Sequence, residues 1–189
     1  STPKGATQIA QLGMKVITGD FTETGGKLLS DVTAVLPKGS LSSSTSRQLN
    51  TTLNNYRKAG QGVIDATGDN TATSAAIDSL KSVKADLLNL LDQGLNLKGV
   101  AASATGTAQL KQQINGILTQ YERNLSQYKP ALELFDVMRE AGMKDGFNVA
   151  DIQKSLASRY MSGNKVLEEL GEVAGRGGPG LTEPGGRDT

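Results

Sequence analysis

The sequence predicts an all-α protein, a bundle of about three long amphipathic helices with shorter helices at both ends and a Gly/Pro-rich C-terminal tail. Two observations support this class. Apolar residues recur at spacings of three and four through long stretches of the chain, as in a helix that buries one face. The sequence contains no convincing alternating run of β-branched residues bounded by turn residues, which a strand would show.

Residues 1–40 are predicted to form short N-terminal helices. A helix over residues 6 to 17 would have the apolar stripe Ile9, Leu12, Val16 and Ile17. A second helix over residues 24 to 36 would have the stripe Leu28, Leu29, Val32, Val35 and Leu36. Pro37, Lys38 and Gly39 are expected to end it.

Residues 41–130 are predicted to form the main bundle. Its first helix begins in the serine cluster "GSLSSSTSRQLN", and Gly60 and Gly62 weaken its later turns. The helical period is held by Leu49, Leu53, Tyr56, Val63 and Ile64.

The next helix is predicted over the segment "TATSAAIDSLKSVKADLLNLLDQG". Asp69, Asn70 and Thr71 are N-cap candidates after the helix breaker Gly68, and Gly94 closes the helix. Its apolar stripe is Ile77, Leu80, Val83, Leu87, Leu88 and Leu91. A stripe at this spacing predicts buried core, with Leu88 among the core residues.

A further long helix lies in "TAQLKQQINGILTQYERNLSQYKP" and is expected to end before Pro130. Its stripe is Leu110, Ile114, Ile117, Leu118, Tyr121, Leu125 and Tyr128. Gly116, inside this helix, costs about 1 kcal/mol relative to Ala, and it either allows close approach of a neighbouring helix or is simply tolerated. The segment "LNLKGVAASATG" permits an antiparallel hairpin with the preceding helix.

Residues 131–174 are predicted to form short helices packed on the bundle, at 131 to 141, 149 to 160 and 163 to 174. Residues 175–189 form a flexible or extended tail, because Gly and Pro dominate and few apolar residues could be buried. The tail is a candidate interaction segment that could lie along a neighbouring subunit. Its candidate residues are Arg176, Pro179, Leu181, Pro184 and Arg187.

Composition argues against most catalytic chemistries. The chain has 189 residues, no Cys and no His, so it lacks disulfides, thiolate nucleophiles, and the commonest general base and metal ligand. A formal net charge of +1 provides no global field for polyanions. We therefore expect no enzyme activity, no catalytic residue, no cofactor and no metal. We also expect no transmembrane segment and no remaining signal peptide at Ser1.

The segment "GMKDGFNVADIQKSL" looks like part of an EF-hand or dockerin calcium loop. With Gly146 at the sixth loop position, however, Ala141, Met143 and Ile152 fall where oxygen ligands are required. The alternative is a helix start in which Asn148 is the N-cap and Asp151 lies in the first turn.

Extended through "SLASRYMSGNKVLEELGEVA", this region resembles helix-turn-helix segments common in phage tail tape-measure and other virion proteins. The resemblance favours an assembly protein. DNA readout is the rival interpretation, but Glu168, Glu169 and Glu172 in the second helix would repel phosphate.

Paired carboxylates, such as Asp136 with Glu140, would form an acid-base site only if one were buried. We expect instead that Asp136 with Arg139, and Lys165 with Glu168, form exposed ion pairs.

These observations favour a non-enzymatic structural protein that acts by helix-mediated self-association, in a virion or a secretion-associated structure. Its partners would be itself or other structural proteins, and no specific nucleic-acid readout is expected. The alternative is a secreted bacterial effector or toxin-like helical domain that binds a host protein or a membrane surface. A virion or secreted location is favoured over a cytoplasmic enzyme.

Overall fold

The structure, a computed structural model, describes residues 3–94, 97–141, 149–160 and 163–171. It confirms the all-α bundle. The helices are α1 (Pro3–Val35), α2 (Ser43–Asp65), α3 (Asn70–Asn89), α4 (Ala104–Ala141), α5 (Val149–Arg159) and α6 (Gly163–Leu170). A π-helical turn (Leu90–Gly94) and a 3-10 turn (Gly99–Ala102) lie between α3 and α4. Within the described ranges, the single β pairing is an isolated bridge between Leu41 and Leu97.

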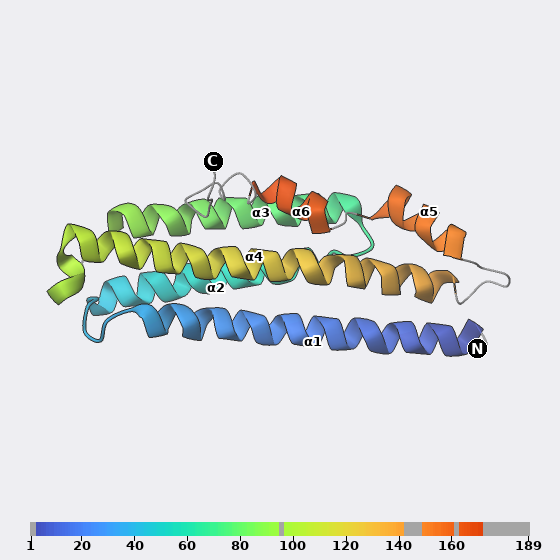
Figure 1. Cartoon of the computed structure of the whole chain (residues 1–189), viewed down its shortest axis with the longest axis horizontal. Helices are drawn as coiled ribbons and strands as arrows, with labels where there is room; N and C mark the ends of the chain where they lie inside the picture. The colour runs from blue at the N-terminus through green and yellow to red at the C-terminus, as the bar shows by residue number, and fades with distance from the viewer. Residues whose placement is uncertain (1–2, 95–96, 142–148, 161–162, 172–189) are drawn as a thin grey trace.

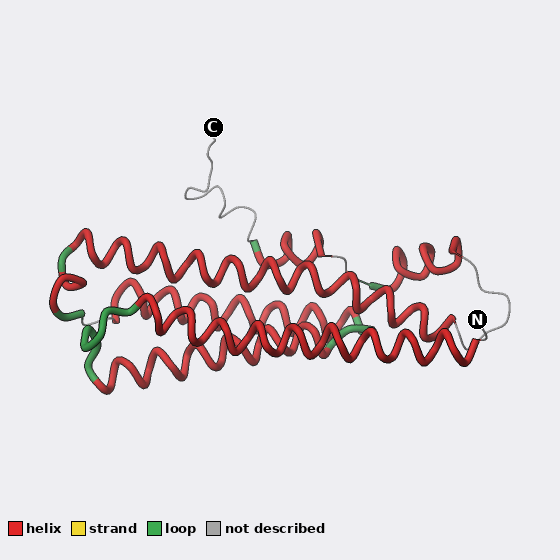
Figure 2. Tube along the Cα trace, turned by 60° about the horizontal axis from the view of Figure 1, so that its bottom comes forward, coloured by secondary structure: helices red, strands yellow, loops and turns green. Residues whose placement is uncertain are grey.

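The bundle is elongated, with α1 packed along α4 and α2 packed along α3 (Figure 1). Figure 2 shows loops gathered at one end of the bundle, whereas the loop between α2 and α3 lies part of the way along α1 and α4. Helices α1 and α4 have 33 and 38 residues, whereas α2 and α3 have 23 and 20. The start of α1 and the end of α4 therefore extend beyond the four-helix section, where α5 packs on α4 (Figure 1). Helix α6 packs on α3 and α4.

The prediction of two short N-terminal helices is wrong, because α1 is continuous from Pro3 to Val35. Thr22 and Thr24, near the predicted break, donate their hydroxyls to backbone carbonyls four residues earlier, at 2.9 and 3.0 Å. Directly before Thr22, Phe21 is fully buried against Tyr121 and Tyr128. Burial of Phe21 outweighs the weak helix propensity of the surrounding Gly, Thr and Asp residues.

Most of the apolar stripe predicted for the helix over residues 6 to 17 is exposed. Ile9, Leu12 and Val16 are 59%, 64% and 54% exposed. The fourth residue of the stripe, Ile17, is partly buried against the core, and the fully buried residue of this part of α1 is Ala10. Because α2 ends before this part of α1, no second helix of the described chain covers the other apolar face.

The predicted helix end before Pro130 is wrong as well, since α4 runs through Pro130 to Ala141 and includes the predicted short helix at 131 to 141. A proline within a helix removes one backbone hydrogen bond and clashes with the preceding turn. Leu125 and Leu132, on either side of Pro130, are both buried. Packing on both sides of the proline holds the helix together despite this local penalty.

The ends of α2 and α3 agree with the predictions. Ser42, in the serine cluster, caps α2 by accepting a hydrogen bond from the Thr45 backbone N–H at 3.2 Å. Asp69 caps α3 by accepting from the Ala72 N–H at 3.0 Å. Gly68 has φ +104°, in the left-handed region, so it supplies the break predicted before the cap. The helical run after α3 ends at Gly94, as predicted.

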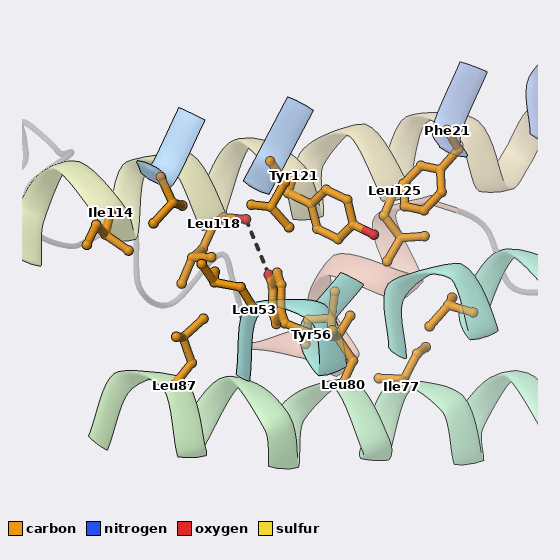
Figure 3. Packing of buried hydrophobic residues seen from close by; sticks show 14 of the residues in the cluster. Phe21, Leu53, Tyr56, Ile77, Leu80, Leu87, Ile114, Leu118, Tyr121 and Leu125 are labelled. Atoms are coloured by element: carbon orange, nitrogen blue, oxygen red, sulfur yellow. Dashed lines mark hydrogen bonds between the residues drawn. The ribbon is translucent and has the colours of Figure 1, made fainter. Parts of the chain in front are cut away.

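The core follows the predicted stripes of α2, α3 and α4 (Figure 3). Leu53, Leu80, Leu87 and Leu118 are fully or almost fully buried, whereas Leu88 is only partly buried. Aromatic rings join the elements, since Tyr121 has its ring centroid 5.2 Å from Phe21 and 5.4 Å from Tyr56. In the described part of the chain, no helix is both long and apolar enough to cross a membrane.

Gly116 and Gly60 play different parts in the packing. A Cβ built at Gly116 would have no neighbouring atom within 4 Å, so no helix of the described chain packs closely against this position. A Cβ at Gly60 would lie 2.5 Å from the Tyr121 hydroxyl oxygen, so the close contact between α2 and α4 requires glycine. The structure therefore excludes close helix approach as the reason for Gly116 and favours the interpretation that this glycine is simply tolerated.

We predict that Gly116→Ala raises the free energy of unfolding by about 0.5–1 kcal/mol, because it removes backbone entropy from the unfolded chain without a clash. Gly60→Ala is the matched control and should lower it, since Tyr121 must move. Chemical denaturation followed by far-UV circular dichroism measures both. A lower stability for Gly116→Ala would contradict the open surroundings of this residue.

We also predict that Leu118→Asp lowers the free energy of unfolding by several kcal/mol, because it buries a charge without a partner. Leu88→Asp should lower it less, since the partly exposed position lets the carboxylate reach water. Thermal unfolding followed by circular dichroism compares the two variants. Equal losses would show that the two leucines are equally enclosed.

Candidate functional site

The exposed face at the start of α1 is the main apolar surface feature of the described chain. We call it the α1 ridge and define it as Ile9, Leu12 and Val16. Their spacings of three and four residues place them on one side of the helix. An isolated exposed leucine is ordinary, but three large apolar side chains in a row form a contiguous patch, which is a feature of interaction sites.

The neighbouring side of α1 lines an open groove of about 820 Å³. Gln8, Gln11 and Lys15 line it from α1, and Arg139 lines it from α4. The α1 ridge and this groove share Leu12. The surface therefore combines an apolar strip with amides and cations along one edge, as partner-binding surfaces do.

A second groove of about 410 Å³ lies between the later part of α1 and the early part of α4. Lys27 and Asp31 line it from α1, while Gly116 and Gln120 line it from α4. Gly116 thus faces this open space and not a neighbouring helix.

Beneath these surfaces, α4 carries a buried polar stripe beside its apolar one. Its buried members recur at spacings of three and four residues and are Glu122, Ser126, Lys129, Glu133 and Asp136. This stripe was not predicted from the sequence, because charged residues between apolar positions usually face solvent. The regular spacing was the signal that could have revealed it.

Glu122, completely buried, links three helices. The Tyr56 hydroxyl of α2 donates to one of its carboxylate oxygens, and the Lys84 ammonium of α3 donates to the other at 3.0 Å. Tyr56 also lies 3.4 Å from the Leu118 carbonyl oxygen, drawn as a dashed line in Figure 3. A buried carboxylate with a cation and a hydroxyl as partners avoids most of the penalty of burying a charge.

Lys129 links α4 to the end of α2 and the start of α3. Its ammonium donates to the Val63 carbonyl at 3.1 Å, to the Thr67 hydroxyl at 2.8 Å and to the Thr73 hydroxyl at 3.3 Å. Burial lowers the pKa of Lys129 from 10.5 to about 8, although the carboxylates of Glu133 and Asp136 oppose this decrease.

Asp136 is buried, which corrects the expectation that its pair with Arg139 is exposed. It accepts a hydrogen bond from Arg139 at 2.5 Å and one from the Tyr160 hydroxyl at 2.5 Å. Burial and this hydrogen bond raise the pKa of Tyr160. Glu140 makes no described contact with Asp136. It pairs with Arg159 of α5, which donates two hydrogen bonds to the Glu140 carboxylate, one of them at 2.6 Å. These contacts attach α5 to the end of α4.

The described contacts of the polar stripe join α4 to other parts of the fold. Glu122 and Lys129 bond to groups of α2 and α3, and Asp136 bonds to Arg139 of α4 and to Tyr160, which follows α5. None of the three lines either groove. A substrate in those grooves would not reach them. Among the residues described by the structure, no group of three or more acidic, His or Cys side chains is placed to hold a metal ion.

The other candidates from the sequence have different outcomes. The tail residues Arg176, Pro179, Leu181, Pro184 and Arg187 lie outside the described residues and stay predictions. Much of the calcium-like segment, residues 142–148, also lies outside them, while Asp151 lies in the first turn of α5 as expected. Lys165 pairs with Glu169 at 3.7 Å instead of Glu168.

Comparison with known proteins identifies no relative: no family model, curated protein or solved structure matches the chain.

The shifted pKa of Lys129 leads to a prediction about stability. Because its pKa is about 8 in the folded state and has its ordinary value of 10.5 in the unfolded chain, the unfolded state binds more protons between these values. The contribution of Lys129 to stability therefore increases as the pH rises through this window. We expect the free energy of unfolding of the wild type, minus that of Lys129→Met, to rise by on the order of 1 kcal/mol from about pH 8 to about pH 9.5.

Urea denaturation at a series of pH values measures this difference. Lys58→Met, at an exposed lysine of α2, is the matched control and should show no comparable rise. Tyrosine hydroxyls of the unfolded chain begin to ionise near the end of this range, but both proteins contain the same tyrosines, so this effect cancels in the difference. A difference that stays constant with pH would show that Lys129 keeps an ordinary pKa in the fold.

Proposed function

We propose that this protein is a non-enzymatic structural protein that acts through helix-mediated self-association. The observation that carries the proposal is the α1 ridge, in which Ile9, Leu12 and Val16 are each more than half exposed on one helix face. A stable fold does not need these large side chains at the surface. Their burial between subunits would remove apolar area from water, which is the main driving force for association.

The polar stripe of α4 is a second observation that supports a structural role. Charged groups that could serve acid-base chemistry are used to join α4 to α2, α3 and the segment after α5. The two described grooves are lined by amides, hydroxyls, cations and apolar groups, and their one carboxylate, Asp31, is only partly buried. These features favour a scaffold over a catalyst.

Assembly in a virion or a secretion-associated structure extends this proposal. It rests on the composition and on the resemblance of the segment near the C-terminus to parts of virion proteins. A secreted effector that binds a host protein is the alternative, and the oligomeric state distinguishes them. An assembly protein forms multimers of itself, whereas an effector with the same ridge stays monomeric.

We predict that the wild-type protein self-associates as its concentration is raised over a hundredfold range, measured by light scattering coupled to size exclusion. The triple variant Ile9→Gln, Leu12→Gln, Val16→Gln should remain monomeric, because the apolar area available for burial is lost. Leu134→Gln is the matched control, since it changes an exposed apolar residue of α4 outside the ridge. It should associate like the wild type.

Far-UV circular dichroism should be the same for all of these variants, because the changed side chains are exposed. Deletion of residues 175–189 in the same experiment tests whether the tail contributes to assembly. A wild-type chain that stays monomeric over the whole range would contradict the proposed function and favour the effector alternative.

A further inference from the structure

We propose that the α1 ridge is the seam of a parallel, in-register pair formed by the α1 helices of two copies of this chain. This inference rests on the proposed function and names its partner and geometry. A second copy is the occupant because the ridge and its flanking charges are complementary to themselves in this arrangement.

The ridge has the spacing and residue types of a two-stranded coiled coil. Ile9, Leu12, Val16 and Gly19 follow spacings of three, four and three, which are alternating a and d positions of a heptad. β-Branched Ile9 and Val16 occupy a positions and Leu12 occupies a d position. In parallel coiled coils, this distribution favours two strands over three or four.

The charges beside the ridge match a parallel pair. Lys15 precedes the a position Val16 and is therefore a g residue, while Asp20 follows the d position Gly19 and is an e residue. In a parallel dimer, a g residue of one helix lies near the e residue five positions later on the other. Lys15 of each copy would then face Asp20 of the other, which gives two symmetric ion pairs.

Lys15 and Asp20 are available for these contacts. Both are exposed, and neither forms an ion pair within the described part of the chain. Their positions on either side of the ridge would place one cation and one anion at each edge of the seam. An exposed ion pair adds little affinity to the dimer. An arrangement that places like charges opposite each other is disfavoured by their repulsion, so the charges select the arrangement in which unlike charges meet.

The shape of the bundle permits this approach. The ridge lies on the side of α1 away from Ala10 and Phe21, which are buried, so two bundles would lie on opposite sides of the paired helices. Helix α2 ends at Asp65, only four residues after Gln61, whose side chain bonds to Thr22 of α1 at 3.2 Å. The ridge thus lies beyond the region where α2 flanks α1. A Cβ at Gly19 would meet no atom within 4 Å, so the backbone there is open to close approach.

The seam is short and ends at a recognisable residue. Glu23 occupies the next a position and is exposed, so an extended seam would place two carboxylates opposite each other. The paired section therefore stops near Gly19. So short a seam buries less than the roughly 800 Å² per partner of a standard interface, and we expect a weak dimer that several contacts in an assembly would reinforce.

Cysteine cross-linking tests the geometry, because the chain contains no cysteine of its own. We expect Ile9→Cys and Val16→Cys each to form a disulfide-linked dimer under mild oxidation, since identical positions face each other in a parallel pair. Ser82→Cys, at an exposed position of α3, is the matched control and should stay largely monomeric. A mixture of the I9C and V16C chains, with one of them tagged, tests the alternative. In an antiparallel pair centred on Leu12, the I9C chain would link to the V16C chain, and the tag would identify this product.

Charge reversal supplies a second, independent readout. Lys15→Asp should weaken the dimer roughly tenfold, because it places two carboxylates together at each edge of the seam. The double variant K15D/D20K should restore the affinity, since it exchanges the two charges. Sedimentation equilibrium of the otherwise unmodified chain measures the dissociation constants.

The outcomes separate the geometry from the proposed function. Self-association with preferential linkage of I9C to V16C, or with no rescue by the double variant, overturns the parallel seam but leaves self-association in place. Dimers that persist in the I9Q/L12Q/V16Q variant place the interface elsewhere and also overturn it. A wild-type chain that is monomeric in sedimentation equilibrium overturns both proposals.

Discussion

The two buried stripes of α4 are the constraint on which the arrangement of the other helices depends. Its apolar stripe, including Leu118 and Leu125, lies in the core, and α1 packs along α4. Its polar stripe reaches α2 and α3 through hydrogen bonds of Glu122 and Lys129. Apolar contact is nondirectional, whereas a buried ammonium needs acceptors at specified places. The polar stripe therefore fixes the axial position of α4 relative to α2 and α3, while the apolar stripe supplies most of the burial.

Much of the fold could be predicted because local signals and core pattern agree in α2 and α3. Ser42 and Asp69 are capping residues directly before apolar stripes, so both starts could be identified. In α1 and α4 the signals conflict. Gly19 and Pro130 are typical of breaks, but Phe21 and Leu132 near them are buried by other helices. The contacts that hold these helices together join residues far apart in sequence, so a local pattern could not weigh them.

Less of the candidate site could be predicted, for two physical reasons. An apolar period identifies a helix face, but it does not say whether another helix is long enough to cover it. Leu12 and Leu53 show the same kind of pattern, yet only Leu53 lies where all the long helices overlap. Similarly, Asp136 and Arg139 have the spacing of an exposed ion pair, and only the packing of Tyr160 on α4 buries the carboxylate. In both cases, exposure follows from how the elements pack and not from residue type.

The difference in helix length connects the stability of the fold to its proposed association. The four-helix section contains the large aromatic and leucine core, and Ile9, Leu12 and Val16 are not part of that cluster. Beyond the turn between α2 and α3, α1 packs on α4 along one side. The opposite face of α1 can be apolar there without disturbing the core. Because Ile9, Leu12 and Val16 are a little more than half exposed, the burial that each forgoes would contribute about 1 to 2 kcal/mol. Burial against a second chain would recover part of this energy, and the helix that presents the ridge is already formed, so association would not have to offset the entropy of folding it.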